Sequence, residues 1–159
     1  MKKLLLIRHA KATHESGFAD FERPLTDKGF KQAELMAARL QVNNLKPQIL
    51  VASPALRTLS TANVFSQVLG LQQAHTDKAI YDASESTLLK VIDSLPQDKD
   101  FVALVGHNPG IAQILYYLSG AIKEVPPCAV ALIEFNLDTW AEIFEQTGKL
   151  AFYDTPSQL

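Results

Sequence analysis

Short apolar runs alternate with helically periodic segments along this 159-residue chain, and this alternation restricts the fold more than any other feature. The runs at residues 4–7, 49–52, 101–105 and 129–135 have the length of strands. Between most of them, apolar residues recur with spacings of three and four, which predicts amphipathic helices. Strands and helices in alternation favour a mainly parallel sheet. We therefore predict a three-layer α/β/α fold with a mainly parallel mixed sheet, in one domain spanning residues 1–159.

The helices are predicted from stripes of apolar residues that would pack on the sheet. The stripes are Ala33, Met36, Ala37 and Leu40; Leu88, Val91, Ile92 and Leu95; and Ile111, Ile114, Leu115 and Leu118. A further helix is expected over residues 54–69, with Ala55, Leu59, Ala62 and Phe65 on its packed side and Arg57 pointing elsewhere. Residues 129–135, 140–144 and 150–153 are predicted as strands of an antiparallel extension.

Two of the predicted helices follow a strand directly, at Ser53-Pro54 and Asn108-Pro109. In each pair a capping residue precedes a proline, which is favoured at the first helical position. The carboxyl ends of parallel strands meet the starts of the following helices at one edge of the sheet, where ligands bind. Free N–H groups at a helix start attract anions. The sequence therefore predicts an anion site at this edge.

Four side chains are expected to gather at that edge: Arg8 and His9 after the first strand, Arg57 in the first turn of a helix, and His107 after a later strand. Guanidinium groups match phosphoryl oxygens bidentately, so two arginines can hold a phosphoryl group. A neutral histidine beside it can accept the group as a nucleophile, and a second can stabilise the charge that shifts during transfer. The pattern predicts phosphoryl transfer through a phosphohistidine at His9.

Charge and cysteine content restrict the partners and the compartment. The chain carries 15 basic and 17 acidic residues, so no broad basic face for nucleic acid or membrane is expected. The lone Cys128 has no partner for an internal disulfide or a zinc motif, which fits a reducing, cytoplasmic location. The apolar run at residues 4–7 is shorter than a signal peptide requires, and no run has the length of a membrane span.

Four segments then point to a family: Leu6-Ile7-Arg8-His9-Ala10-Lys11; Arg23-Pro24-Leu25-Thr26 with Gly29 and Gln32-Ala33; Ser53-Pro54 with Arg57-Thr58 and Thr61-Ala62; and Gly106-His107-Asn108-Pro109-Gly110. In this order they resemble the histidine phosphatase superfamily, with the phosphoglycerate-mutase-like fold, and within it the short phosphohistidine phosphatases of the SixA type. The resemblance implies that His9 is the phosphorylated nucleophile and that Arg8, Arg57 and His107 complete the phosphate pocket. It also implies that no metal or organic cofactor is used.

The remaining catalytic role is that of a general acid. Asp20, three residues before Arg23, matches the position of a proposed acid in the SixA-type proteins, whereas Asp82 and Glu85 lie nearer to the position used by larger relatives. We favour Asp20, with an ordinary surface-loop role as the alternative. Arg23 is expected to order this loop by pairing with an acidic neighbour.

The resemblance and the short interval between Arg57 and His107 lead to three hypotheses of function. The interval leaves little room for a lid, and an open pocket suits a histidine-phosphorylated protein, with a phosphotransfer or signalling role, as substrate and partner. The first hypothesis is therefore a metal-independent phosphohistidine phosphatase. The alternative is a phosphatase of small phosphate monoesters, which a strongly basic or aromatic pocket wall would favour. The third is a non-catalytic module that binds phosphoproteins.

Overall fold

The structure is a computed structural model that describes residues 1–156. In chain order the elements are β1 (Lys2–Arg8), the short helix η1 (Asp20–Glu22), α1 (Asp27–Val42), β2 (Ile49–Ala52), α2 (Leu56–Leu69), β3 (His75–Thr76), η2 (Lys78–Ile80), α3 (Glu85–Asp93), β4 (Phe101–Gly106), α4 (Gly110–Ser119), β5 (Val130–Phe135), η3 (Trp140–Glu142) and β6 (Gly148–Asp154). Within these residues, no helix has both the length and the hydropathy needed to cross a membrane.

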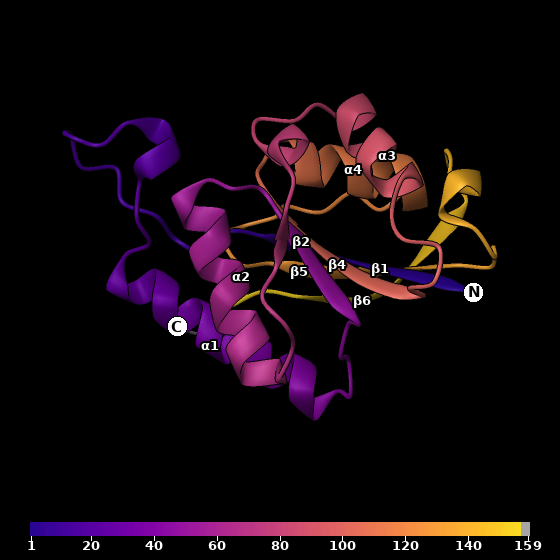
Figure 1. Ribbon diagram of the computed structural model, residues 1–159, viewed down its shortest axis with the longest axis horizontal. Helices are drawn as coiled ribbons and strands as arrows, with labels where there is room; N and C mark the ends of the chain where they lie inside the picture. Colours follow the sequence, from indigo (N-terminus) through magenta and orange to yellow (C-terminus); the bar gives the residue numbers. More distant parts are fainter. Residues whose placement is uncertain (157–159) are drawn as a thin grey trace.

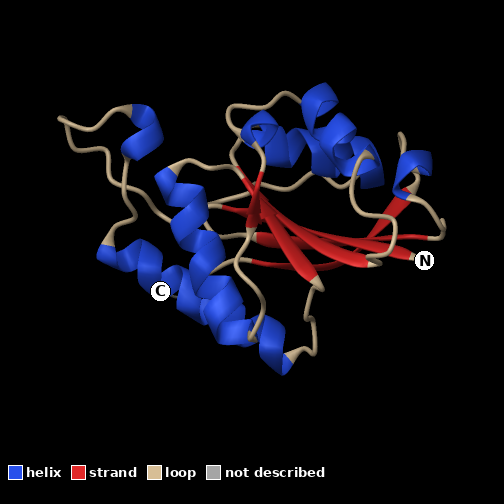
Figure 2. Ribbon diagram, in the orientation of Figure 1, coloured by secondary structure: helices blue, strands red, loops and turns tan. Residues whose placement is uncertain are grey.

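The strands form one mixed sheet in the order β3-β2-β4-β1-β5-β6. The first four of these strands are parallel to one another, and β5 and β6 extend the sheet in the antiparallel sense. Helices α1 and α2 cover one face of the sheet, and α3 and α4 cover the other (Figures 1 and 2). The predicted three-layer α/β/α fold with a mainly parallel mixed sheet is confirmed.

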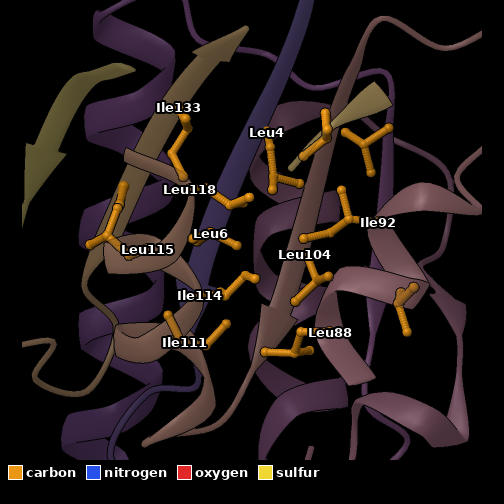
Figure 3. Packing of buried hydrophobic residues seen from close by; sticks show 14 of the residues in the cluster. Leu4, Leu6, Leu88, Ile92, Leu104, Ile111, Ile114, Leu115, Leu118 and Ile133 are labelled. Carbon is orange, nitrogen blue, oxygen red and sulfur yellow. The ribbon is translucent and has the colours of Figure 1, made fainter. Parts of the chain in front are cut away.

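Alternation along each strand divides the core into two layers. On β1, Leu4 and Leu6 face α3 and α4, whereas Leu5 and Ile7 face α1 and α2. Figure 3 shows the first layer, where side chains from both helices surround Leu104 of β4 and the leucines of β1. Because β1 is central, it is buried on both faces, which explains its unbroken apolar run.

The carboxyl ends of β1, β2 and β4 lie at one edge of the sheet. Arg8 is in register with Gly106, and Ala52 is in register with Val105, so the next residues, His9, Ser53 and His107, emerge together. The expected meeting of these segments is confirmed.

Both predicted helix starts are displaced. Helix α2 begins at Leu56 with Ala55 as its N-cap, and α4 begins at Gly110 with Pro109 as its N-cap. Ser53 does not cap α2, since its hydroxyl contacts His107. Asn108 does bind the first turn of α4: its Oδ1 accepts from the amide of Ala112 at 3.2 Å, while its side-chain amide donates to the carbonyl of Val125. The expected capping contact is therefore present for Asn108, whereas Ser53 shapes the sheet edge instead.

Two further predictions require correction. Residues 140–144 do not form a strand: the fully buried Trp140 lies in η3, where its indole N–H donates to the carbonyls of Pro96 and Lys99. On α2 the buried side runs through Thr58, Thr61 and Phe65, so Leu59 is only half-buried. Arg57 lies next to this stripe and is itself 6% exposed, which places its charge inside the molecule.

Candidate active site

His9 is held in one tautomer by the backbone carbonyl of the next residue, Ala10. Its Nδ1 lies 2.7 Å from the carbonyl oxygen of Ala10. A carbonyl oxygen only accepts, so Nδ1 carries the proton and Nε2 keeps its lone pair. Burial lowers the pKa of His9 to about 3, and the charges of His107, Arg8 and Arg57 add to this effect against the opposing hydrogen bond. The imidazole is therefore neutral at physiological pH, with Nε2 available as a nucleophile.

The second histidine is fixed by Ser53. His107 Nε2 lies 2.8 Å from Ser53 Oγ, and Nδ1 is buried without a partner in the described chain. The amide of Ala55 donates to the same hydroxyl oxygen, which leaves the Ser53 hydroxyl proton free to donate to Nε2. Burial, followed by the charge of Arg57, lowers the pKa of His107 to about 4. The ring centroids of His9 and His107 are 5.5 Å apart, so two neutral imidazoles face the same space.

Two arginines concentrate positive charge beside these rings. Arg8 donates from Nη1 to the carbonyl of Val125, and burial together with the charge of Arg57 lowers the pKa of its guanidinium. The Nε atoms of Arg8 and Arg57 are both buried without a hydrogen-bond partner within residues 1–156. Buried donors without partners are rare in native proteins, because each loses its bond to water without replacement. Both Nε atoms therefore lack an acceptor.

Asp20 connects η1 to this cluster. Its Oδ2 accepts from Arg57 Nη2 at 3.1 Å and from the Tyr81 hydroxyl at 2.6 Å, while its Oδ1 accepts from Arg23 Nε at 3.2 Å. Arg57 Nη1 also donates to the backbone carbonyl of Asp20 at 2.7 Å. The Tyr81 hydroxyl, followed by Arg57 and Arg23, lowers the pKa of Asp20 to about 2. The carboxylate is therefore ionised, and the expected pairing of Arg23 within the loop is confirmed.

An aromatic side leads from this cluster to the surface. The Tyr81 ring meets His107 edge-on at 5.5 Å between centroids, and Phe21 meets Tyr81 in the same way at 5.1 Å. Phe21 is 42% exposed, and Phe18 of the same loop is also exposed. In Figure 1 the segment that carries η1 extends outward from the layered body. The aromatic residues beside the cluster thus come from two segments, the loop before α1 and residue 81 in the interval between Arg57 and His107.

A pocket of about 400 Å³ opens among these residues. Arg8, His9, Arg57 and His107 line its buried end, so the four residues predicted from sequence share one cavity. Its outer wall contains four more basic residues, namely Lys11, His14, Arg23 and Lys28. No acidic residue within the described chain lines it. The strongly basic wall was absent from the sequence-based expectation, because its members come from three separate segments.

A second hollow, of about 520 Å³, lies beside β3 and the end of α3. It is larger, yet none of the four predicted residues lines it, and its wall is mainly apolar. Size alone does not indicate a reaction site, whereas a convergence of polar groups with shifted pKa values does. We therefore place the candidate site in the basic pocket.

Sequence reasoning did not single out several residues that support the site. Ser53 was expected to cap a helix, although it holds His107. Thr61 accepts from the amide of Ala10 at 3.0 Å and donates to the carbonyl of Arg57 at 2.8 Å, so one hydroxyl ties the loop after β1 to α2. Tyr81 follows β3 and η2, two short elements with no periodicity in the sequence. Ser53 and Thr61 lay within a segment that carried the resemblance, whereas Tyr81 did not.

Comparison with known proteins agrees with this geometry. Residues 4–87, more than half of the chain, match the histidine phosphatase superfamily (branch 1). An uncharacterised chloroplastic protein of Arabidopsis thaliana is 28% identical over 92% of this chain and 72% of its own. The protein histidine phosphatase SixA, solved with tungstate, superposes with a TM-score of 0.84 at 19% identity, covering 98% of this chain and 97% of its own. The corresponding values for a protein assigned as the phosphohistidine phosphatase SixA of Agrobacterium tumefaciens are 0.82, 24%, 98% and 98%. The chain shares the fold of these structures and belongs to the histidine phosphatase superfamily.

Proposed function

We propose that this protein is a phosphatase that hydrolyses phosphohistidine on another protein, through a phosphohistidine formed at His9. The observation that carries the proposal is the set of unsatisfied nitrogens. Of the four buried side-chain atoms without partners in residues 1–156, three belong to Arg8, Arg57 and His107. A tetrahedral anion offers acceptors to all of them at once. Tungstate, the ligand of the similar SixA structure, is such an anion.

The transfer step follows from the histidine geometry. His9 Nε2 attacks phosphorus, the bond from phosphorus to the substrate nitrogen breaks, and its electron pair returns to the leaving imidazole. Arg8, Arg57 and a proton on His107 Nδ1 stabilise the phosphoryl oxygens during transfer. Water then attacks phosphorus, His9 regains its lone pair, and inorganic phosphate departs with the remaining proton going to solvent. In the first half-reaction the His9 nitrogen replaces the substrate nitrogen on phosphorus. In the second, the oxygen of water replaces the His9 nitrogen.

The ionised state of Asp20 supports a phosphohistidine substrate over an ester. An alkoxide leaves readily only if an acid protonates it, and a carboxyl whose pKa is about 2 carries no proton at neutral pH. A substrate imidazole that is protonated on its far nitrogen leaves as a neutral molecule without further protonation. An adjacent carboxylate favours that cationic form. Asp20 does not itself line the pocket and contacts Arg57 and Tyr81. We therefore propose that its negative charge stabilises the protonated substrate ring without direct contact, whereas proton donation would require these hydrogen bonds to rearrange.

The test is phosphate release by the wild type, by His9→Ala and by Asp20→Asn in metal-chelated buffer. A histidine-phosphorylated carrier domain is compared with small phosphate esters at equal concentration. We expect carrier-selective turnover that His9→Ala abolishes, and a larger loss for Asp20→Asn on the carrier than on esters. Equal rates on carrier and esters, or turnover that survives in His9→Ala, would contradict the proposal.

The basic outer wall favours a second candidate, a phosphatase of small esters that carry a further negative charge. Lys11, His14, Arg23 and Lys28 surround the mouth of the pocket, where a second anionic group would lie. The exposed Phe18 and Phe21, in the segment whose Asp20 contacts Arg57, instead suit contact with a protein surface. The ester panel of the assay above therefore includes esters that carry a second anionic group. Turnover confined to these esters would establish the second candidate. Binding of the carrier without turnover would establish a phosphoprotein-binding module.

A further inference from the structure

We infer that Lys11 and Lys28 form a second anion subsite, which binds a negatively charged group attached next to the phosphoryl group of the substrate. The inference rests on the phosphate site of the proposed function and adds a determinant of specificity to it. The ligand chemistry is a second anion, either an acidic side chain beside phosphohistidine or a second phosphate on a small molecule.

Pocket size leaves room for such a group. A phosphoryl group fills roughly 120 Å³ if each heavy atom takes about 30 Å³, the volume of a water molecule in the liquid. The pocket holds about 400 Å³, so most of it lies beyond the phosphoryl group. Because His9, Arg57 and His107 are buried, Arg8 is half-buried and the two lysines are exposed, the remaining space lies on the lysine side.

The balance of charge decides what this space would bind. Asp20 pairs with both Arg57 and Arg23, so the one charge of Asp20 and the two of a phosphoryl dianion together match Arg8, Arg23 and Arg57. Lys11 and Lys28 have no acidic partner within ion-pair distance in residues 1–156. Two positive charges therefore remain on the outer wall after the phosphoryl group is bound, and a second anion would neutralise them.

The two lysines are held on one wall by backbone contacts. The carbonyl of Lys11 accepts from the amide of Thr26 at 2.9 Å, and its amide donates to Gln32 Oε1 at 2.9 Å. A Cβ on Gly29 would overlap the Lys11 carbonyl, so only glycine lets the start of α1 approach this closely. Lys28 lies in that first turn and also lines the pocket. These contacts explain the sequence pattern at Gly29 and Gln32 and hold the backbones that carry the two lysines next to each other.

The first test measures binding and needs no turnover. Methylphosphonate carries one anionic group, and methylenediphosphonate carries two on the same carbon; neither is hydrolysed. Titration calorimetry is performed on the wild type, Lys11→Gln and Lys28→Gln. Lys31→Gln is the control, since Lys31 is exposed on α1 and does not line the pocket. We expect the wild type and the control to bind the diphosphonate about tenfold more tightly, and each variant to lose about three- to tenfold of this preference. Equal binding of the two ligands by the wild type, or equal loss in Lys31→Gln, would overturn the subsite.

A second test identifies the source of the anion. Two phosphohistidine peptides differ by Glu or Gln beside the phosphorylated residue, and propane-1,3-diyl bisphosphate is compared with propyl phosphate. A lower KM for the Glu peptide assigns the subsite to protein carboxylates, and a lower KM for the bisphosphate assigns it to a second phosphate. Turnover of both pairs without any preference would overturn the inference. Retained diphosphonate preference without hydrolysis of any substrate would leave the subsite standing and refute the proposed phosphatase activity.

Discussion

The two ends of β1 each carry a basic residue, Lys2 fully buried and Arg8 half-buried, and they differ in what surrounds the charge. At the amino end, Lys2 is 1% exposed and its ammonium group donates to the carbonyls of Gln97 and Lys99 and to Asp100, all within 3.1 Å. It also lies 5.4 Å from the centroid of the Trp140 ring. At the carboxyl end, Arg8 has a single carbonyl partner, an unpartnered Nε and a second guanidinium nearby.

This difference separates a structural charge from a functional one. Every N–H of the Lys2 ammonium has an acceptor, so the protein itself balances the cost of burial. At the carboxyl end of β1, hydrogen-bond donors and positive charge have no partners. This destabilises the free protein and favours the binding of an anion. We expect substitutions at the amino end to change stability and those at the carboxyl end to change activity.

Arg8→Met should cause the largest effect. Loss of one charged donor to the phosphoryl group is expected to lower kcat/KM roughly 100- to 1,000-fold. The free energy of unfolding should change by less than about 1.5 kcal/mol, because one hydrogen bond is lost while repulsion from Arg57 is relieved. Phosphate release and urea unfolding measure the two quantities. A large loss of stability with activity retained would break the comparison.

Lys2→Met should show the reverse. Removal of three charged hydrogen bonds and the contact with Trp140 is expected to cost about 3 kcal/mol in unfolding free energy, with kcat/KM unchanged. Lys3→Met is the matched control. Its side chain is 39% exposed and pairs with Glu134 only at 3.8 Å, so its loss should cost less than about 1 kcal/mol. Equal costs for the two variants would refute the structural role of Lys2.

Acid should destabilise the protein through the two histidines that follow the carboxyl ends of β1 and β4. The folded-state pKa values of His9 and His107 are about 3 and 4, below the ordinary 6.5. As pH falls from 6.5 to 5, the unfolded chain therefore takes up protons that the folded chain does not. The free energy of unfolding should decrease by up to about 1.4 kcal/mol per pH unit for each histidine. His107→Asn should reduce this slope in urea titrations. A flat profile in the wild type would contradict the low pKa values.

Tyr81→Phe should have the smallest effect. The variant removes the hydroxyl that holds Asp20, so the pKa of Asp20 should rise and kcat should fall by about three- to tenfold. A shift in the acidic limb of the pH–rate profile would distinguish this positioning role from a loss of packing. The control is Tyr116→Phe on the exposed face of α4. An unchanged pH–rate profile would show that Tyr81 does not position Asp20 for the reaction.

Periodicity and segment order predicted much of this molecule. The apolar runs located β1, β2, β4 and β5, because strands buried in a sheet need continuous apolar sequence. The two-residue β3 carries no such pattern and depends on its pairing with β2. Residues 140–144 read as a strand because Trp140 is apolar, although its burial follows from indole hydrogen bonds to distant carbonyls. Local patterns do not encode such tertiary contacts.

The site shows the same division. Arg8, His9 and His107 directly follow strands whose ends meet, so their proximity could be predicted, and the short spacing of Arg57 from β2 brought it to the same edge. The contacts of Asp20 with Tyr81 and of His107 with Ser53 join residues 61 and 54 positions apart. No periodicity specifies such pairs. The basic wall likewise depends on the packing of the start of α1 against Lys11, which no local sequence pattern specifies.

The most direct test of the account is chemical trapping of phosphate on the enzyme. The wild type is mixed with a radiolabelled histidine-phosphorylated carrier, quenched in alkali within milliseconds and mapped by mass spectrometry. We predict an acid-labile, alkali-stable phosphate on His9 that forms and decays at rates compatible with turnover. Turnover with no label on the enzyme, or with label on another residue, would contradict the assignment of His9 as the nucleophile.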